Sequence, residues 1–344
     1  MRVLIAPDCF GGTLTAREAA DAIATGWHEA KPDDVVVRRP LADGGPGFVD
    51  VLHAALGGDV QHTTVTSPLG TPVEARWLRH THDGKRTAYV ESAEACGLHL
   101  VPAELRAASC ETATTRGVGE LIAAAAADND VIVVGLGGSG TTDGGAGMLA
   151  ALADAAVELT DISLVAASDV ENPLLGPHGA ARTFGPQKGA SPEAVERLEA
   201  KLAAMDVLRP VSDISGAGAA GGLGAALLTL GATVRSGAGL VRELTALDAA
   251  FDTADLVVTG EGSFDWQSLR GKLITAVAAG AADRAVPCIA IAGQVSVGRR
   301  EMAAAGVQDA YSVSEHVGSV QKSIADARKS LVATARHVAR QWSH

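Results

Sequence analysis

The chain has 344 residues and a formal net charge of −12, from 28 Lys and Arg against 40 Asp and Glu. A negative field of this size repels nucleic-acid phosphates and anionic lipid head groups, so we expect neither nucleic acid nor a membrane among its partners. The length is typical of two domains, and 40 glycines favour the close packing of a layered α/β protein. The 4 cysteines are dispersed without metal-ligand spacing, which is typical of reduced thiols in a cytoplasmic protein.

Strands and helices alternate at both ends of the chain. A buried strand at Val3–Ala6 precedes a helix at Ala16–Ala30, for which Thr15 and Glu18 form a capping box, and a second strand follows at Val35–Val37. The pattern returns near the C-terminus, where we expect strands at Leu256–Thr259, Cys288–Ala292 and Ala310–Val313 and helices at Gly271–Ala282, Gly298–Ala305 and from Ser319 onward. Five parallel strands with intervening helices predict a doubly wound domain.

The residue pattern changes in the middle of the chain. The new pattern predicts an inserted mixed α/β domain. Three short β-rich runs separated by turn residues indicate antiparallel hairpins, at Thr63–Thr66, Val73–Leu78 and Thr87–Val90. A strand at Val131–Val134, which could belong to either sheet, lies among helices expected at Gly119–Ala127, Gly145–Ala153 and Pro192–Met205. We therefore predict a discontinuous domain of residues 1–57 and 247–344, interrupted by residues 58–246.

Acidic residues follow several strands of the doubly wound domain. Ligands of open parallel sheets bind beyond the carboxyl ends of the strands, which is where Asp8, Asp43 and Glu261 lie. Carboxylates that share one crevice repel each other unless a cation is present, and Mg²⁺ with a nucleotide would supply one. We assign Asp8 and Asp43 as metal ligands. The alternative is that both only cap the helices that follow them.

A glycine-rich loop follows the strand at Val131–Val134 and leads into a helix. Such a loop presents backbone N–H groups to an anion, so we expect phosphate contacts at Gly137, Gly138, Ser139, Thr141 and Thr142. The spacing is close to that of a P-loop, but Thr141 stands where the lysine is needed, so this is not a Walker A loop. The alternative is a tight strand–helix turn.

Two further segments carry polar and charged residues suited to phosphoryl transfer. Asp169, Asn172 and Lys188 follow the loop, and a lysine held between Pro-Gln and Gly favours binding to a carboxylate or phosphate. Lys272, at the predicted start of a helix, opposes the helix dipole and so favours a bound anion. The candidates for a catalytic base are Asp169, Glu261 and Asp265, and the sequence does not rank them.

Taken in order, these segments resemble the glycerate kinase family over nearly the whole chain. The matching blocks are Ala6-Pro-Asp-Cys-Phe-Gly-Gly-Thr-Leu-Thr-Ala16, Pro40-Leu-Ala-Asp-Gly-Gly45, Gly135-Leu-Gly-Gly-Ser139, Thr142-Asp-Gly-Gly145, Asn172-Pro-Leu174, Phe184-Gly-Pro-Gln-Lys-Gly-Ala190, Gly218-Ala-Ala-Gly-Gly-Leu-Gly224 and Thr259-Gly-Glu-Gly262. The resemblance implies ATP- and Mg²⁺-dependent phosphorylation of D-glycerate, on a flavodoxin-like domain with an inserted second domain. We expect the substrates in a cleft between the two domains, and a homo-oligomer is compatible with this interpretation.

The chain departs from the family pattern at charged positions. The family usually has Lys at Gly11, Glu at Pro46 and Arg at Ser263. Arg116, where the family usually has an aromatic residue, is our candidate for a substitute cation that binds the substrate carboxylate.

Three alternative functions are compatible with the sequence. The departures are compatible with a different hydroxy acid as substrate, or with a ligand-binding protein that has lost turnover. A nicotinamide-dependent oxidoreductase would instead use the glycine pattern at Gly216–Gly221.

Overall fold

The computed structural model describes residues 1–266, 268–269 and 273–343, and the chain divides into two compact units. Met1–Asp43 and Ala238–His344 form one of them, which we call the terminal unit. Gly44–Gly237 form the other, the central unit. Each unit has its own sheet and its own core.

The terminal unit is built on a parallel sheet of five strands. Its strands stand in the order β13-β11-β9-β1-β2 and all pair in parallel, with bounds β1 Arg2–Pro7, β2 Val35–Arg38, β9 Leu256–Gly260, β11 Cys288–Ala292 and β13 Asp309–Ser312. Two short strands, β10 (Ser263–Phe264) and β12 (Gln294–Val295), pair just beyond the ends of β9 and β11. Renumbered within this unit, the order is that of a flavodoxin-like sheet, which confirms the predicted fold class.

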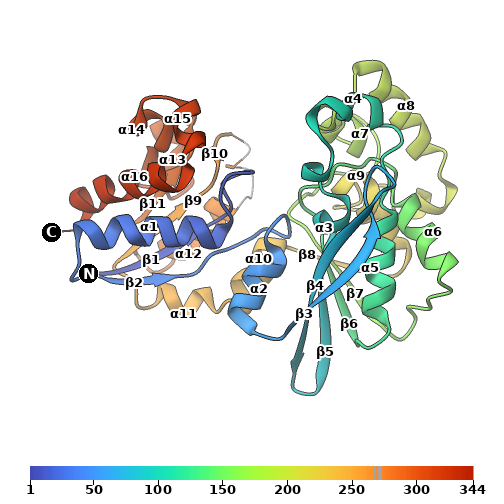
Figure 1. Ribbon diagram of the computed structural model, residues 1–344, viewed down its shortest axis with the longest axis horizontal. Helices are drawn as coiled ribbons and strands as arrows, with labels where there is room; N and C mark the ends of the chain where they lie inside the picture. Colours follow the sequence, from blue (N-terminus) through green and yellow to red (C-terminus); the bar gives the residue numbers. More distant parts are fainter. Residues whose placement is uncertain (267, 270–272, 344) are drawn as a thin grey trace. The chain divides into compact units, whose positions relative to one another are not determined.

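The first and last helices pack together on one face of this sheet (Figure 1). The capping box is confirmed, because Thr15 Oγ1 accepts from the Glu18 amide and the Glu18 carboxylate accepts from the Thr15 amide. Ile23 and Trp27 are fully buried against alternate residues of β1. The helices of the unit are α1 Ala16–Ala30, α10 Gly237–Leu244, α11 Leu247–Phe251, α12 Leu273–Ala282, α13 Arg299–Ala304, α14 Val313–Val317, α15 Val320–Ala325 and α16 Ala327–Trp342.

The single long helix predicted from Ser319 is wrong, because the chain breaks at Asp326. That residue has φ −139° and ψ 65°, outside the helical region, and its side chain accepts a hydrogen bond from the Lys329 amide. An Asp that caps a new helix in this way competes with continuation of the previous one. The segment therefore forms α15 and α16 with a bend between them.

The central unit contains a mixed sheet of six strands. Their order is β3-β4-β5-β6-β7-β8, antiparallel from β3 to β5 and parallel from β5 to β8, with bounds β3 Asp59–Thr66, β4 Pro72–His82, β5 Lys85–Glu91, β6 Val131–Gly135, β7 Ser163–Ala167 and β8 Thr233–Arg235. The predicted hairpins are confirmed. The strand predicted at Val131–Val134, which could have joined either sheet, is β6 of the central sheet. β7 and β8 were not predicted. β7 is a short Ala-rich run, and all three residues of β8 are exposed.

Helices of the central unit cover the sheet and enclose a second core. α5 packs against α6 and against β3, and Leu121 and Ile122 of α5 are fully buried (Figure 1). The bounds of these helices are α2 Phe48–Leu56, α3 Ser92–Cys96, α4 Arg106–Ser109, α5 Arg116–Ala126, α6 Ala146–Asp154, α7 Ala180–Phe184, α8 Pro192–Ala203 and α9 Ala219–Thr229. The three helices predicted here, α5, α6 and α8, lie within three residues of their expected bounds, and the other helices of this unit were not predicted.

The division between the two units differs from the boundaries expected at residues 57 and 247. α2, which we placed in the discontinuous domain, contacts β4 and β5 and groups with the central unit. The chain returns to the terminal unit at Ala238, near the start of α10. Packing, rather than the Gly57-Gly58 pair, sets the first boundary.

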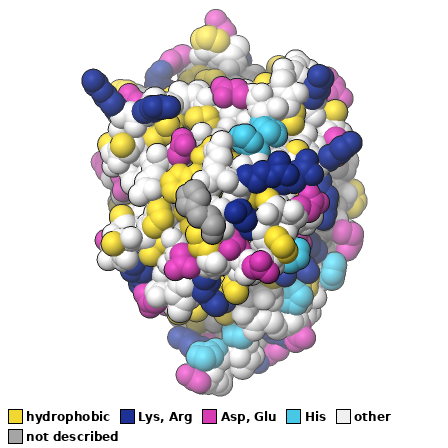
Figure 2. Space-filling view, turned by 90° about the vertical axis from the view of Figure 1, so that its left-hand side faces the viewer, with side chains coloured by type: hydrophobic (Ala, Val, Ile, Leu, Met, Phe, Trp, Pro, Cys, Tyr) yellow, Lys and Arg dark blue, Asp and Glu magenta, His cyan; other side chains and the backbone are white. Residues whose placement is uncertain are grey.

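Charged side chains of both signs are spread over the face drawn in Figure 2. The net negative charge therefore does not make this face uniformly acidic. Among the described residues, no helix combines the length and the apolar character needed to cross a membrane.

Gly221 offers a test of how closely α9 packs against the glycine-rich loop. Its φ is +70°, and a Cβ atom added there would overlap the carbonyl oxygen of Thr141. Gly231 is a matched control, since its φ is +84° but a Cβ would meet nothing within 4 Å. We expect Gly231→Ala to cost about 1 kcal/mol of unfolding free energy from the left-handed backbone alone. Gly221→Ala should cost roughly 1–3 kcal/mol more because of the overlap.

Urea denaturation of both variants measures the difference. Equal losses for the two would show that α9 can move away from the loop without cost.

Candidate active site

Acidic side chains gather at the carboxyl edge of the terminal sheet, as the sequence predicts. Asp8 follows β1 and its amide bonds the Gly260 carbonyl at 2.8 Å, directly before Glu261. The Asp8 carboxylate accepts from the Cys9 amide at 2.6 Å. Burial raises the pKa of Asp8 well above its usual range, and the nearby charges of Asp43 and Glu261 raise it further. The carboxyls therefore lie close enough to repel one another.

The donor set of this cluster fits a Mg²⁺–nucleotide better than a metal held by protein alone. Among the described residues, no three His, Cys, Asp or Glu side chains are grouped so that they could hold a metal ion by themselves. Mg²⁺ usually takes only one or two protein carboxylates when substrate phosphates supply further oxygens. A cation would also relieve the repulsion that acts on Asp8. Metal binding at Asp8 and Asp43 stays a prediction.

Asp265 lies in the turn that follows β10. Its amide donates to Ser268 Oγ at 3.3 Å, and its carboxylate accepts from Ser263 Oγ at 3.4 Å. Asp265 thus belongs to a local turn near the acidic cluster, on the same segment as Glu261. Lys272, our candidate for a phosphate contact, lies outside the described residues.

In the central unit, most of the glycine-rich loop between β6 and α6 is buried, and several of its amides already make hydrogen bonds within the protein. The Gly137 amide donates to the Gly44 carbonyl at 3.1 Å, and the Gly140 amide donates to the Cys96 carbonyl at 2.8 Å. The Thr141 amide donates to Ser139 Oγ at 3.1 Å. These three amides already have acceptors within the protein, so the predicted phosphate contacts at Gly137–Ser139, Thr141 and Thr142 depend on the remaining ones.

Lys188 is buried, which the sequence did not predict. It ends the 3-10 helix Pro186–Lys188, is 4% exposed, and its Nζ donates to the Thr141 carbonyl at 2.5 Å. Burial lowers the pKa of Lys188 to about 8, and Cys96 and Asp143 oppose that shift. Among the described residues this ammonium makes one hydrogen bond, although it has three protons to donate. A buried cation with spare donors is a group that an anionic ligand would stabilise.

Asp143 is a residue whose role the sequence analysis missed. Its buried carboxylate accepts from the Thr115 amide and hydroxyl, both at 2.8 Å, and from the amides of Gly145 at 3.0 Å and Gly147 at 3.1 Å. It therefore joins the start of α5 to the start of α6. Its place inside the glycine-rich motif, as a lone acid among small residues, was the available signal.

Asp169 and Asn172 lie in the segment after β7. Asp169 Oδ1 accepts from Ser236 Oγ at 2.6 Å, which orders this carboxylate at the carboxyl end of the strand. Asn172 Nδ2 donates to the His178 carbonyl at 2.7 Å and contacts Thr183 Oγ1 at 3.4 Å. The amide of Asn172 thus shapes its own loop.

Arg116 is engaged in ion pairs on the surface of the central unit. It begins α5, where its Nε bonds Glu120 at 3.1 Å and its Nη2 bonds Asp154 of α6 at 2.8 Å. These carboxylates occupy two sides of the guanidinium, so the structure gives Arg116 a role in holding α5 to α6. Binding of the substrate carboxylate by Arg116 stays a prediction.

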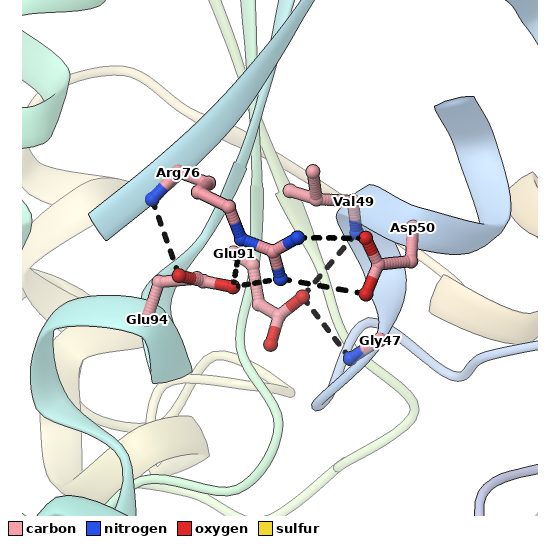
Figure 3. Close-up of polar contacts among 6 residues, drawn as sticks. All are labelled: Gly47, Val49, Asp50, Arg76, Glu91 and Glu94. Atoms are coloured by element: carbon pink, nitrogen blue, oxygen red, sulfur yellow. Dashed lines mark hydrogen bonds and ion pairs between the residues drawn. The ribbon is translucent and has the colours of Figure 1, made fainter. Parts of the chain in front are cut away.

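Glu91 is a second residue that the sequence analysis missed. It ends β5 opposite Gly135, is 3% exposed, and its Oε2 accepts from the amides of Gly47 at 3.1 Å and Val49 at 3.3 Å. Figure 3 shows this carboxyl turned toward the start of α2, beside Arg76. Arg76 in turn pairs with both Asp50 and Glu94. Glu91 therefore caps α2, whose own N-cap residue Gly47 has no side chain to do so.

Replacement of Glu91 by Gln tests the environment of this carboxyl. Burial and then the charge of Glu94 raise the pKa of Glu91 to about 8, against the opposing effect of the Val49 and Gly47 amides. The native state therefore keeps a proton that the unfolded chain releases. Wild-type stability should fall as the pH rises from the ordinary Glu range to about 8, by on the order of 1 kcal/mol per pH unit.

Glu91→Gln should lack this loss, so its stability relative to wild type should increase over that interval. Exposed Glu104→Gln is the control, and thermal denaturation at several pH values is the measurement. Parallel curves for wild type and Glu91→Gln would contradict the raised pKa.

Comparisons with known proteins identify the family of this chain. A model of the glycerate kinase family matches residues 3–159 and 153–343. An uncharacterized protein of Mycobacterium bovis is 49% identical over 349 residues, which cover 98% of this chain and 91% of that protein. Glycerate 2-kinase of Escherichia coli strain K12 is 38% identical over 374 residues, which cover 98% of this chain and 97% of that enzyme.

A solved structure extends the similarity to three dimensions. The crystal structure of a protein assigned as glycerate kinase 2 from Salmonella typhimurium LT2 matches with a TM-score of 0.76 at 37% sequence identity. The match covers 99% of this chain and 98% of that one. Because the family model, the relatives and the structure all match along nearly the full length, the chain belongs to the glycerate kinase family.

Proposed function

We propose that the protein transfers the γ-phosphoryl group of ATP to a hydroxyl of D-glycerate, with phosphoglycerate and ADP as products. The relative named glycerate 2-kinase supports glycerate as the acceptor. The observation that carries the proposal is the buried ammonium of Lys188, which has donors to spare beside a glycine-rich loop. Both substrates are anions, and a desolvated cation favours the binding of an anion.

Phosphoryl transfer requires positioning and charge neutralisation more than covalent participation by the protein. In the central unit, Lys188 would bind an oxygen of the transferred phosphoryl group or of the glycerate carboxylate. In the terminal unit, Asp8 and Asp43 would hold Mg²⁺. When bound, this ion would offset the negative charge of the nucleotide phosphates. The expectation that both sets of groups act in one interdomain cleft stays a prediction.

A carboxylate is needed to accept the proton of the attacking hydroxyl. The hydroxyl oxygen forms a bond to the γ-phosphorus, the bond from that phosphorus to the leaving oxygen of ADP breaks, and the proton passes to the base. We favour Asp169, because its carboxylate is ordered by Ser236 and lies in the same unit as Lys188. Glu261 and Asp265 remain alternatives.

The oxidoreductase alternative receives no support from the local structure. A dinucleotide-binding glycine motif follows a strand, whereas Gly216–Gly221 follows the 3-10 helix Asp206–Val211. No specific observation favours a ligand-binding protein without turnover.

Lys188→Met tests the proposed role of the ammonium, because methionine keeps much of the aliphatic stem but removes the charge. We expect kcat/KM with ATP and glycerate to fall by at least ~10²-fold. The melting temperature should stay the same or rise, since the cost of burying a cation is removed. In wild type, kcat/KM should also fall as the pH rises through about 8, where Lys188 loses its charge, and the variant should lack this descent.

Lys201→Met is the control, since Lys201 is exposed on α8 and bonds only the Glu111 carbonyl among the described residues. Near-normal activity of Lys188→Met would refute the assignment.

Asp8→Asn tests the acidic cluster with two measurements. The Mg²⁺ concentration for half-maximal activity should rise about 10-fold, because one of two proposed ligands loses its charge. The pKa of Asp8 is raised, so its contribution to stability is lost as the pH rises, and the amide should make the protein more stable than wild type at neutral pH.

Asp21→Asn serves as the control, because Asp21 pairs with Arg38 on the surface of α1. An unchanged Mg²⁺ requirement would remove Asp8 from the metal site, whatever happens to stability.

A further inference from the structure

A cavity of about 300 Å³ opens in the terminal unit, beyond the carboxyl ends of its central strands. The loops that follow β1, β9 and β11 line one side of it, and residues of α14, α15 and α16 line the other. In an open parallel sheet this edge is where ligands bind. The volume is at the lower end of the range for small-molecule sites.

The lining of the cavity suits a flat, largely apolar ring with polar edges. The apolar side chains on its walls are those of Phe10, Leu14, Val313, Ile324 and Leu331. Gly11, Gly262 and Gly293 leave backbone exposed to the cavity, which lets a ring approach the main chain closely. Gln294, Thr13 and Ser323 supply polar atoms in the lining.

Hydrogen bonds within the chain shape one wall of the cavity. The Phe10 amide donates to the Leu14 carbonyl at 2.8 Å, and Thr13 Oγ1 donates to the Phe10 carbonyl at 2.5 Å. This closed turn holds the Phe10 ring, which is 6% exposed. A preformed wall reduces the ordering that a ligand must impose on the protein.

The loops that line the cavity also carry the acidic cluster. Asp8 precedes Phe10 in the loop after β1, and Glu261 is joined directly to Gly262 in the loop after β9. A ligand that filled the cavity and reached along these loops would therefore need an apolar ring at one end and a cation-bound anionic group at the other. Glycerate has no apolar ring, whereas ATP has both parts.

We propose that this cavity binds the adenosine part of ATP. The purine would lie between the apolar walls, and the phosphates would extend toward Asp8 and Glu261. This inference rests on the proposed ATP-dependent function, which leaves the position of the nucleoside open. It assigns nucleoside recognition to the terminal unit alone.

Filling the cavity from either wall tests the proposal. Gly11 lines the cavity, a Cβ atom added there would meet nothing within 4 Å, and the backbone is not left-handed, so we expect Gly11→Leu to narrow the cavity without backbone strain. Ala327→Phe fills it from α16 on the opposite wall. Ala325→Phe is the control, because Ala325 is exposed on neighbouring α15 and does not line the cavity.

Calorimetric titration with ADP and with adenosine is the measurement. We expect both filled variants to raise the Kd for each probe at least ~10-fold and the control to leave it unchanged. The KM for glycerate should change less than about twofold in all three variants, because the acceptor lies outside the cavity. Wild-type affinity for ADP and adenosine in both filled variants would overturn the proposal.

The two proposals can fail separately. If wild type phosphorylates glycerate with ATP but the filled variants bind ADP normally, the adenosine site is wrong and the function stands. If wild type binds adenosine through this cavity but does not phosphorylate glycerate, the function is wrong and the site stands.

Discussion

The buried carboxylate of Asp143 holds the loop on which the central unit's candidate site depends. Four donors from two helix starts converge on it, which compensates the cost of placing a charge in the interior. With the starts of α5 and α6 fixed to one group, the backbone between Ser139 and Gly145 has little freedom. The carbonyl of Thr141 is thereby held where Lys188 reaches it and where Gly221 packs against it. The position of the buried ammonium is thus a consequence of a carboxylate that it does not bond directly.

Local patterns were sufficient to predict much of the fold. The alternation of apolar strands and capped helices identified every strand of the terminal five-stranded sheet. Three of them, β1, β9 and β11, are apolar runs that are buried almost throughout. The break between α15 and α16 at Asp326 was not predicted, because in the sequence a capping Asp cannot be distinguished from an Asp on the solvent-exposed face of one continuous amphipathic helix. β8 could not be predicted either, because its three exposed residues owe their strand conformation to pairing with β7.

The part of the candidate site that could be predicted is the part whose position depends only on the topology of the parallel sheet. Acids at the ends of adjacent parallel strands must meet, and the interaction of Asp8 with Asp43 and Glu261 follows from that rule. The burial of Lys188, the four hydrogen bonds to Asp143 and the capping of α2 by Glu91 could not be predicted. Each depends on contacts between segments that are distant in the sequence, and residue type does not reveal such contacts. The ion pairs of Arg116 with Glu120 and Asp154 were likewise not predictable from its place near a glycine-rich motif.

The insertion of one unit within another has a consequence for biosynthesis. In the terminal sheet β1 pairs with β9, so that Val3 lies opposite Leu256. The first βαβ unit therefore leaves the ribosome long before β9 has been synthesised. The edge of β1 that pairs with β9 stays unpaired while the central unit is synthesised. The central unit has all its strands in one continuous stretch and can fold during that delay. Closing so long a loop slows assembly of the terminal sheet, so the nascent N-terminal segment is the part of this protein most exposed to aggregation and to chaperone binding.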